Sequence, residues 1–208
     1  RKLKFDINKF QKFKDKIIYI IHKNEPPEIA KLSDKDSEDI KSYKLIVNAH
    51  LRENDQRNHI SKGLTDADDD DLILVSDVDE IPNFDYINLS KLKNKIIMFE
   101  QEIFYYKFNR YLPNFTWYGT KACKKKNLIS PQWLRNIKNK RFPFWRIDTF
   151  FSKNKYIDKI FIKNGGWHFS NIKNANEIFI KHKNDEHHDE FDLTEINVRD
   201  IEDMLKNK

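Results

Sequence analysis

Two carboxylates at the end of an apolar run are the strongest chemical signal in this sequence. Residues 72–82 read LILVSDVDEIP, so a short apolar segment leads directly into Asp77, Asp79 and Glu80. On extended backbone, residues two apart point to the same side. Two such carboxylates repel each other unless a cation lies between them, and Mn²⁺ and Mg²⁺ favour oxygen ligands. We therefore expect Asp77 and Asp79 to bind Mn²⁺ or Mg²⁺; a solvated acidic turn is the alternative.

A second group of chemically useful side chains follows later in the chain. Residues 165–170 read GGWHFS, in which Trp167 offers an apolar face to a sugar ring and His168 can bind a metal. Residues 187–190 read HHDE, and with them His188 and Glu190 could complete a metal shell or supply a base. A semi-buried histidine and an exposed polar turn are the alternative interpretations. A zinc site is not expected, because the HExxH and Cys/His spacings are absent.

Arg57 and Asn58 stand about twenty residues before the two aspartates, within a predicted helix. An arginine there could pair with a diphosphate, although an exposed helix face is an equally good interpretation. Neither a GxSxG nor a GxxxxGK[ST] motif occurs, and four glycines leave no glycine-rich phosphate cradle.

Composition indicates a folded domain with a strongly solvated surface. The 208 residues are 38% hydrophobic and 35% charged, and no apolar run approaches the roughly 20 residues that a membrane span needs. Cys123 is the single cysteine, which excludes a disulfide within the sequence. The net charge of +6 comes from lysines scattered along the chain, so nucleic acid is not an expected partner.

The elements that must position these side chains alternate between strand and helix. We predict one α/β domain over residues 1–208, with a parallel look to its first half. Apolar and β-branched runs predict strands at 16–21, 43–47, 72–75, 96–99, 103–108, 146–151 and 159–162. Capping signals and periodicity predict helices at 49–62, 131–137, 174–183 and 194–205, with a loop at 25–42 and a turn at Gly165-Gly166.

Together these segments resemble a known family. Residues 70–82, DDLILVSDVDEIP, resemble the central motif of glycosyltransferase family 17, the β-1,4-mannosyl-glycoprotein 4-β-N-acetylglucosaminyltransferase family. Further matches occur in the family's order: LKF at 3–5, QRN at 56–58, WYGT at 117–120, GWHFS at 166–170 and HDEF at 188–191. Each motif alone is weak, but the ordered set spans nearly the whole chain.

The resemblance implies a GT-A-like fold, a Rossmann-type mixed sheet flanked by helices. It implies inverting sugar transfer from a UDP-sugar, UDP-GlcNAc above all, to a glycan or glycoprotein acceptor, with Mn²⁺ or Mg²⁺ at Asp77 and Asp79. A cation between the carboxylates and the diphosphate would stabilise the leaving group.

The resemblance also gives roles to other residues. His168 would be a further metal or diphosphate ligand, with His188 as its substitute. Trp167 would line the sugar site, and Arg57, Asn58 and Asp77 would contact the donor. The remaining catalytic candidates are Glu80, which would orient the carboxylates or touch the sugar, and Glu190 or Asp148 as the base, between which the sequence does not choose.

One departure from the family pattern bears on the nucleotide pocket. Family members begin with a further strand and helix before the stretch that matches LKF, and we expect this first unit to be missing here. Either the chain is truncated, or the nucleotide pocket is altered or lost. Two other functions therefore stay open: metal-dependent phosphoryl transfer, as in a nuclease, and carbohydrate binding by a non-catalytic relic. Animal relatives act in the Golgi lumen, and a microbial or viral protein would be cytoplasmic; the sequence does not decide the compartment.

Overall fold

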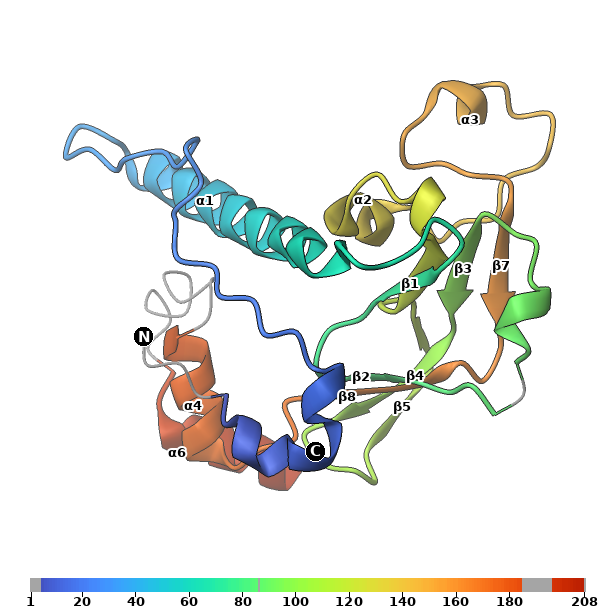
Figure 1. The fold of residues 1–208 in the computed structure, drawn as a ribbon. Coiled ribbons are helices and arrows are strands. Elements are labelled where there is room, and N and C mark those ends of the chain that lie inside the picture. Colours follow the sequence, from blue (N-terminus) through green and yellow to red (C-terminus); the bar gives the residue numbers. More distant parts are fainter. Residues whose placement is uncertain (1–4, 86, 185–195, 208) are drawn as a thin grey trace.

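The computed structural model describes residues 5–85, 87–184 and 196–207, whose strands form two four-stranded sheets flanked by helices (Figure 1). The first sheet has the order β1-β6-β3-β7 and the second the order β2-β8-β4-β5. The first comprises β1 (Leu72–Val75), β3 (Ile96–Phe99), β6 (Lys121–Lys124) and β7 (Lys159–Ile162). The second comprises β2 (Glu80–Pro82), β4 (Gln101–Tyr105), β5 (Tyr111–Trp117) and β8 (Gly166–Ser170).

Short connections join the two sheets. β3 passes into β4 through Glu100, and β7 passes into β8 through residues 163–165. The Glu100 N–H donates to the Ile162 carbonyl at 2.9 Å, and the Gly165 N–H donates to the Glu100 carbonyl at 2.8 Å. A Cβ on Gly165 would lie 2.7 Å from the Ile162 carbonyl oxygen, so the crossing admits only glycine without a shift. The loop between β1 and β2, which carries Asp77 and Asp79, also joins the two sheets, because β1 belongs to the first sheet and β2 to the second.

The core lies around the central strand β3. All four residues of β3 are buried, as a continuous apolar run predicts for a strand covered on both faces. The main buried cluster combines strand residues with α2 (Pro131–Asn136): Val75, Ile96, Met98, Cys123, Trp133, Leu134, Ile137 and Phe161. The predicted strands 72–75, 96–99 and 159–162 are confirmed residue for residue.

The remaining helices cover the sheets or extend from them. α1 (Glu38–His59) begins at Ser37, whose hydroxyl caps it by accepting from the Ile40 N–H, and its last turn contacts α2 (Figure 1). α4 (Ala175–Asn184) and α6 (Val198–Asn207) pack on each other, and α3 (Asp148–Phe151) sits in a loop that projects from the body. Short 3₁₀ helices occur at η1 (Ile7–Lys16), η2 (Ile60–Leu64), η3 (Leu89–Lys91) and η4 (Lys125–Asn127).

The structure corrects three predictions in the first half of the chain. Residues 16–21 end η1 and continue as coil, and Ile18 is largely exposed; among the described residues no strand pairs with this segment. Residues 43–47 belong to α1 and are not a strand. The predicted helix 49–62 begins too late, since α1 starts at Glu38 and Asn48 lies inside it. The buried Asn48 amide exchanges hydrogen bonds with the Ala30 backbone, accepting at 2.9 Å and donating at 2.8 Å.

Further corrections concern the second half of the chain. Residues 146–151 do not form a strand; they include α3. β5 and β6 were not predicted, and Gly166 opens β8 at a φ of +125° where a turn was expected. The parallel look of the first half is also wrong, since β1 pairs antiparallel with β6; parallel pairing is confined to β3–β7 and β4–β8. The predicted class, α/β with a mixed sheet flanked by helices, is confirmed.

Candidate functional site

The loop between β1 and β2 sends its carboxylates in different directions. Residues 78 and 79 form a turn, so the extended backbone assumed for Asp77 and Asp79 is not present. The Glu80 N–H donates to the Asp77 carbonyl at 3.1 Å, and the Asp77 N–H donates to Glu80 Oε2 at 3.0 Å. Asp77 then faces arginines from α1 and α2, whereas Asp79 faces His168 on β8. The two aspartates therefore have separate partners.

Asp77 lies between two guanidinium groups. Arg135 Nη2 donates to Asp77 Oδ2 at 2.6 Å, and Arg57 Nη2 donates to Asp77 Oδ1 at 3.4 Å. Arg57 also donates to Glu53 at 2.7 Å and to Gln132 at 2.5 Å. Burial lowers the pKa of Arg57, but the pairing with Glu53 and Asp77 outweighs it, so the pKa is raised and the group stays charged. This end of the site therefore holds two fixed positive charges.

Glu80 is the structural centre of the loop. Its side chain is fully buried, and Arg135 Nη1 donates to both of its oxygens at 3.0 Å. The Trp117 indole N–H donates to Oε1 at 2.7 Å, and the Thr120 hydroxyl donates to Oε2 at 3.3 Å. These contacts use both carboxylate oxygens of Glu80 and hold the loop in place.

Asp79 and His168 form the accessible part of the site. His168 Nε2 lies 3.6 Å from Asp79 Oδ2, and both side chains are partly exposed. The adjacent His168 lowers the pKa of Asp79, so this carboxylate is charged at neutral pH. Trp117 stacks on the His168 ring with centroids 4.7 Å apart and fixes its plane. His168 Nδ1 is buried and has no hydrogen-bond partner among the described residues, which leaves Nε2 as the atom that faces Asp79.

Strand alternation separates Trp167 from His168. His168 lies opposite Glu80 and Ile103, whereas Trp167 lies opposite Ile81 and Glu102, on the other face of the second sheet. The aromatic ring beside His168 is therefore that of Trp117, which the sequence analysis did not single out as a site residue. The only signal for it was the WYGT segment of the family resemblance.

A cleft of about 670 Å³ opens beside Asp77. One wall is the coil of residues 19–26, and the other is the second half of α1 with Arg57. His22 Nε2 lies 2.8 Å from Asp55 Oδ2, and the His22 and His59 rings meet edge to face with centroids 4.5 Å apart. The segment predicted as a buried strand therefore forms the wall of a cavity that ends at Asp77.

The other predicted site residues lie outside this cluster. Asn58 Oδ1 accepts from the Gln132 N–H at 3.1 Å, which ties α1 to the start of α2. Asp148 is paired with Arg146 at 2.6 Å and with Lys155 at 2.8 Å, on a loop well away from β2 and β8 (Figure 1). Those two cations hold the pKa of Asp148 far below its usual value, which makes it a weak base. His188 and Glu190 lie outside the described residues.

Gly119 is required by the packing around Glu80. A Cβ at this position would lie 1.6 Å from Glu80 Oε1 and 2.1 Å from Trp117 Nε1. We expect Gly119→Ala to lower the free energy of unfolding by roughly 1–3 kcal/mol or more, measured by urea denaturation, because the buried carboxylate must move. Gly63→Ala is the control, since its Cβ would meet only the flexible end of Ile20 at 2.9 Å. Equal losses in both variants would contradict this account.

Lys121 secures the helix that presents Arg135. Its buried ammonium donates to the carbonyls of Arg135 and Ile137 at 2.7 and 2.6 Å. Burial lowers the pKa of Lys121 to about 7, so between pH 7 and 9 the unfolded chain binds more protons at this residue than the folded chain. We expect stability to rise with pH over this window, by urea denaturation, and to rise less in Lys121→Met. Identical slopes would refute the assignment. The window ends near pH 9. Burial raises the pKa of Cys123 to about 12, so above pH 9 the folded chain binds more protons at this thiol than the unfolded chain, and this contribution lowers stability as the pH rises.

In this structure Asp77 and Asp79 face different partners, so the shared cation site expected from the sequence stays a prediction. Within residues 5–85, 87–184 and 196–207, no group of three or more His, Cys, Asp and Glu side chains is placed to hold a metal ion. Asp79 and His168 are a carboxylate and an imidazole close enough for one cation to contact both. A cation there needs its other ligands from a substrate phosphate and water, which is the usual arrangement for Mg²⁺.

Comparison with known proteins identifies the family. The model of glycosyltransferase family 17 matches residues 2–206, nearly the whole chain. No curated protein and no solved structure matches the sequence. In the part of the chain that the structure describes, no helix is long and apolar enough to cross a membrane. A family match over this length, on a chain that brings a carboxylate, an imidazole and two arginines to one loop, shows that the chain belongs to glycosyltransferase family 17.

Proposed function

We propose that this glycosyltransferase takes its sugar from a UDP-sugar, UDP-GlcNAc in the first instance, and delivers it to a glycan or glycoprotein acceptor with inversion. The observation that carries the proposal is the Asp79–His168 pair. In the sequence, Asp79 follows two residues after Asp77, which lines the end of the cleft formed by α1 and residues 19–26. The cleft has the size and mixed lining of a small-molecule site. Phosphoryl transfer, the alternative enzyme class, has no comparable support in a chain of this family.

In this proposal the nucleoside occupies the cleft and the diphosphate lies at its Asp77 end. Arg57 and Arg135 supply fixed positive charge there, and a diphosphate would compete with Asp77 for their donors. Because Arg57 has a second carboxylate partner in Glu53, it keeps its orientation when Asp77 is displaced.

Asp79 and His168 would hold Mn²⁺ or Mg²⁺ on the diphosphate. The cation would supply Lewis-acid stabilisation of the negative charge that grows on the leaving group. Trp117 keeps the imidazole plane fixed, and Glu80 with Arg135 keeps the loop in place, so these residues act by positioning. For the base, Glu190 and Asp148 stay predictions, and the contacts of Asp148 make it the weaker of the two.

Release of UDP from UDP-GlcNAc is the direct test, measured with a glycan acceptor and with water alone. We expect turnover to fall to background in excess EDTA and to return when Mn²⁺ or Mg²⁺ is added back. Calorimetry with UDP should show binding that strengthens in the presence of Mn²⁺. A matched chelator-treated sample that receives Ca²⁺ controls for effects on the fold.

Two outcomes would contradict the proposal in different ways. If turnover is insensitive to chelation, a metal ion has no part in the reaction, and Arg57 and Arg135 are left as the groups that stabilise the diphosphate. Glycan binding without heat from UDP and without turnover would instead identify a non-catalytic carbohydrate-binding relic.

A further inference from the structure

The loop of residues 139–153 is held closed at its base. The Lys138 N–H donates to the Asn154 carbonyl at 2.8 Å, and the Trp133 indole N–H donates to the Lys153 carbonyl at 2.8 Å. The buried Lys159 ammonium donates to the Lys140 carbonyl at 2.6 Å. A loop with joined ends of this kind is a compact surface element. Its tip therefore has a defined place on the protein.

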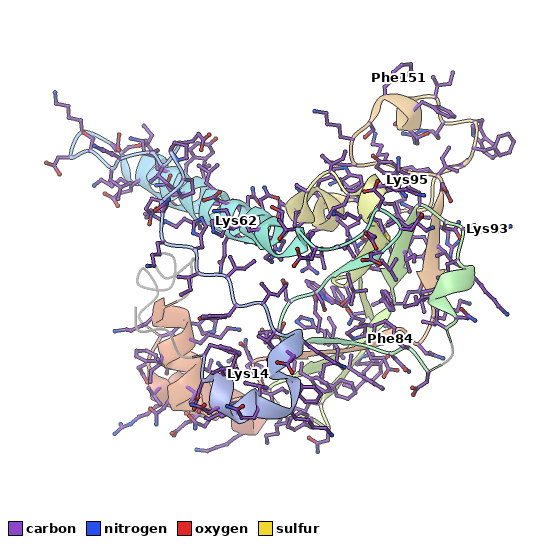
Figure 2. All side chains as sticks on the ribbon, viewed as in Figure 1. Lys14, Lys62, Phe84, Lys93, Lys95 and Phe151 are labelled. Carbon is purple, nitrogen blue, oxygen red and sulfur yellow. The ribbon has the colours of Figure 1, made fainter. Side chains whose placement is uncertain are left out.

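The tip of this loop exposes an unusual amount of apolar surface. Five large side chains are between 67% and 85% exposed: Phe144, Trp145, Ile147, Phe150 and Phe151. The loop projects from the body (Figure 1), and Phe151 lies at its outer end (Figure 2). Phe144 and Trp145 meet edge to face with ring centroids 5.0 Å apart. Single exposed apolar residues are common, but five of them on one short loop indicate an interaction surface.

The loop and its base carry an excess of positive charge. Residues 138–155 contain six cations, Lys138, Lys140, Arg141, Arg146, Lys153 and Lys155. Asp148 is the single carboxylate in this stretch, and it is already paired with Arg146 and Lys155, while the Arg141 guanidinium lies over the Phe161 ring of β7. Exposed aromatic side chains on a loop rich in lysine and arginine suit the interface of an anionic bilayer, where the rings enter the headgroup region and the cations meet lipid phosphates.

We propose that the loop 139–153 is a membrane-interface anchor, which inserts Phe150, Phe151 and Trp145 into the surface of a bilayer rich in anionic lipid. The shape favours this partner, because the tip is convex and sugar or peptide sites are concave. The loop projects from the body away from β2 and β8, the strand that carries His168 (Figure 1). Apart from Asp148, which stays a candidate for the base, this surface contains none of the residues assigned to sugar transfer.

Co-sedimentation of the full chain with vesicles tests the proposal. We expect binding to phosphatidylcholine vesicles that contain phosphatidylserine, and at least tenfold weaker binding to phosphatidylcholine alone. Replacing Phe150 and Phe151 with serine should weaken partitioning to the anionic vesicles by tenfold or more. The matched control replaces Ile40 and Tyr43 with serine, which removes exposed apolar surface from α1 and should leave partitioning unchanged. Trp145 fluorescence should shift to the blue when anionic vesicles are added, and the shift should be lost in Trp145→Phe.

Two further measurements make the result decisive. Near-ultraviolet circular dichroism of the tip variant should match the wild type, because the replaced rings are exposed and contribute little to the core. Failure of the wild type to bind vesicles, or equal binding by the tip and control variants, would overturn the proposal. A tip variant that changes only the molecular mass in solution would overturn the proposal and assign the surface to contact with a second copy of the chain. A tip variant that changes only the KM for a glycan acceptor would overturn it and assign the surface to acceptor binding.

Discussion

Replacing Asp79 with asparagine is expected to reduce turnover of the donor sugar by roughly 100-fold or more while leaving the fold intact. The substitution keeps the shape of the side chain and removes the negative charge that faces His168. The fold should survive because the substitution keeps the backbone contact with β8, in which the Asp79 carbonyl accepts from the Phe169 N–H at 2.9 Å. Initial rates of UDP release at saturating Mn²⁺ measure the effect, and urea denaturation measures the stability.

The pH dependence of this variant sharpens the test. His168 lowers the pKa of Asp79 below its ordinary value of 3.8, so the carboxylate stays ionised throughout pH 5–8. The ratio of wild-type to Asp79→Asn rates should therefore be constant across that range. Asp85→Asn, an exposed aspartate in the loop after β2, is the control and should keep the wild-type rate. If Asp79→Asn turns over the donor at the same rate as the control, Asp79 has no role in the reaction.

The structure divides the acidic triplet between two tasks. Asp77 and Glu80 are bound to Arg135 and form an ion-pair network that fixes the loop. Asp79 has His168 as its partner and remains partly exposed. Asp77 is paired with two guanidinium groups and is therefore a poor ligand for a metal ion. A cation at this loop would depend on Asp79 and on substrate oxygens. This division gives each of the three carboxylates of the loop a partner on another element.

The sequence predicted the strands around the site better than the site's internal contacts. Runs such as IIMF at residues 96–99 are buried on both faces, so composition alone identifies them. β5 was missed because all but its last residue are exposed and it contains Pro113 and Asn114, which are depleted in strands. Residues 16–21 have the composition of a buried strand but no partner, and only the tertiary structure shows this.

The directions of side chains decided which site predictions fitted. Asp77 and Asp79 were expected to share one cation because extended backbone was assumed, whereas a turn at residues 78–79 separates them. Trp167 and His168 were grouped by sequence proximity, although neighbours on a strand face opposite sides of the sheet. Arg135 could not have been found from the sequence, since it reaches Glu80 across 55 positions and belongs to no motif noted there.

Replacing Arg135 with glutamine is expected to cost about 3–5 kcal/mol of unfolding free energy, because it leaves the fully buried Glu80 carboxylate without its cation. Urea denaturation monitored by tryptophan fluorescence gives the loss. Arg57→Gln is the matched control: both arginine side chains are 12% exposed, but the carboxylates that Arg57 binds are 31% and 40% exposed. Water can solvate those carboxylates when Arg57 is removed, so the control should lose less stability.

A double-mutant cycle separates the lost ion pair from the lost packing. In Glu80→Gln combined with Arg135→Gln, two neutral amides occupy the site, and part of the stability should return relative to Arg135→Gln alone. Arg135→Lys should not restore it. Arg135 places Nη1 on both Glu80 oxygens and Nη2 on Asp77, and a single ammonium cannot reproduce this planar arrangement. If the lysine variant were as stable as the wild type, charge alone would hold the loop, and the guanidinium geometry would not be the element that places Asp77 and Glu80.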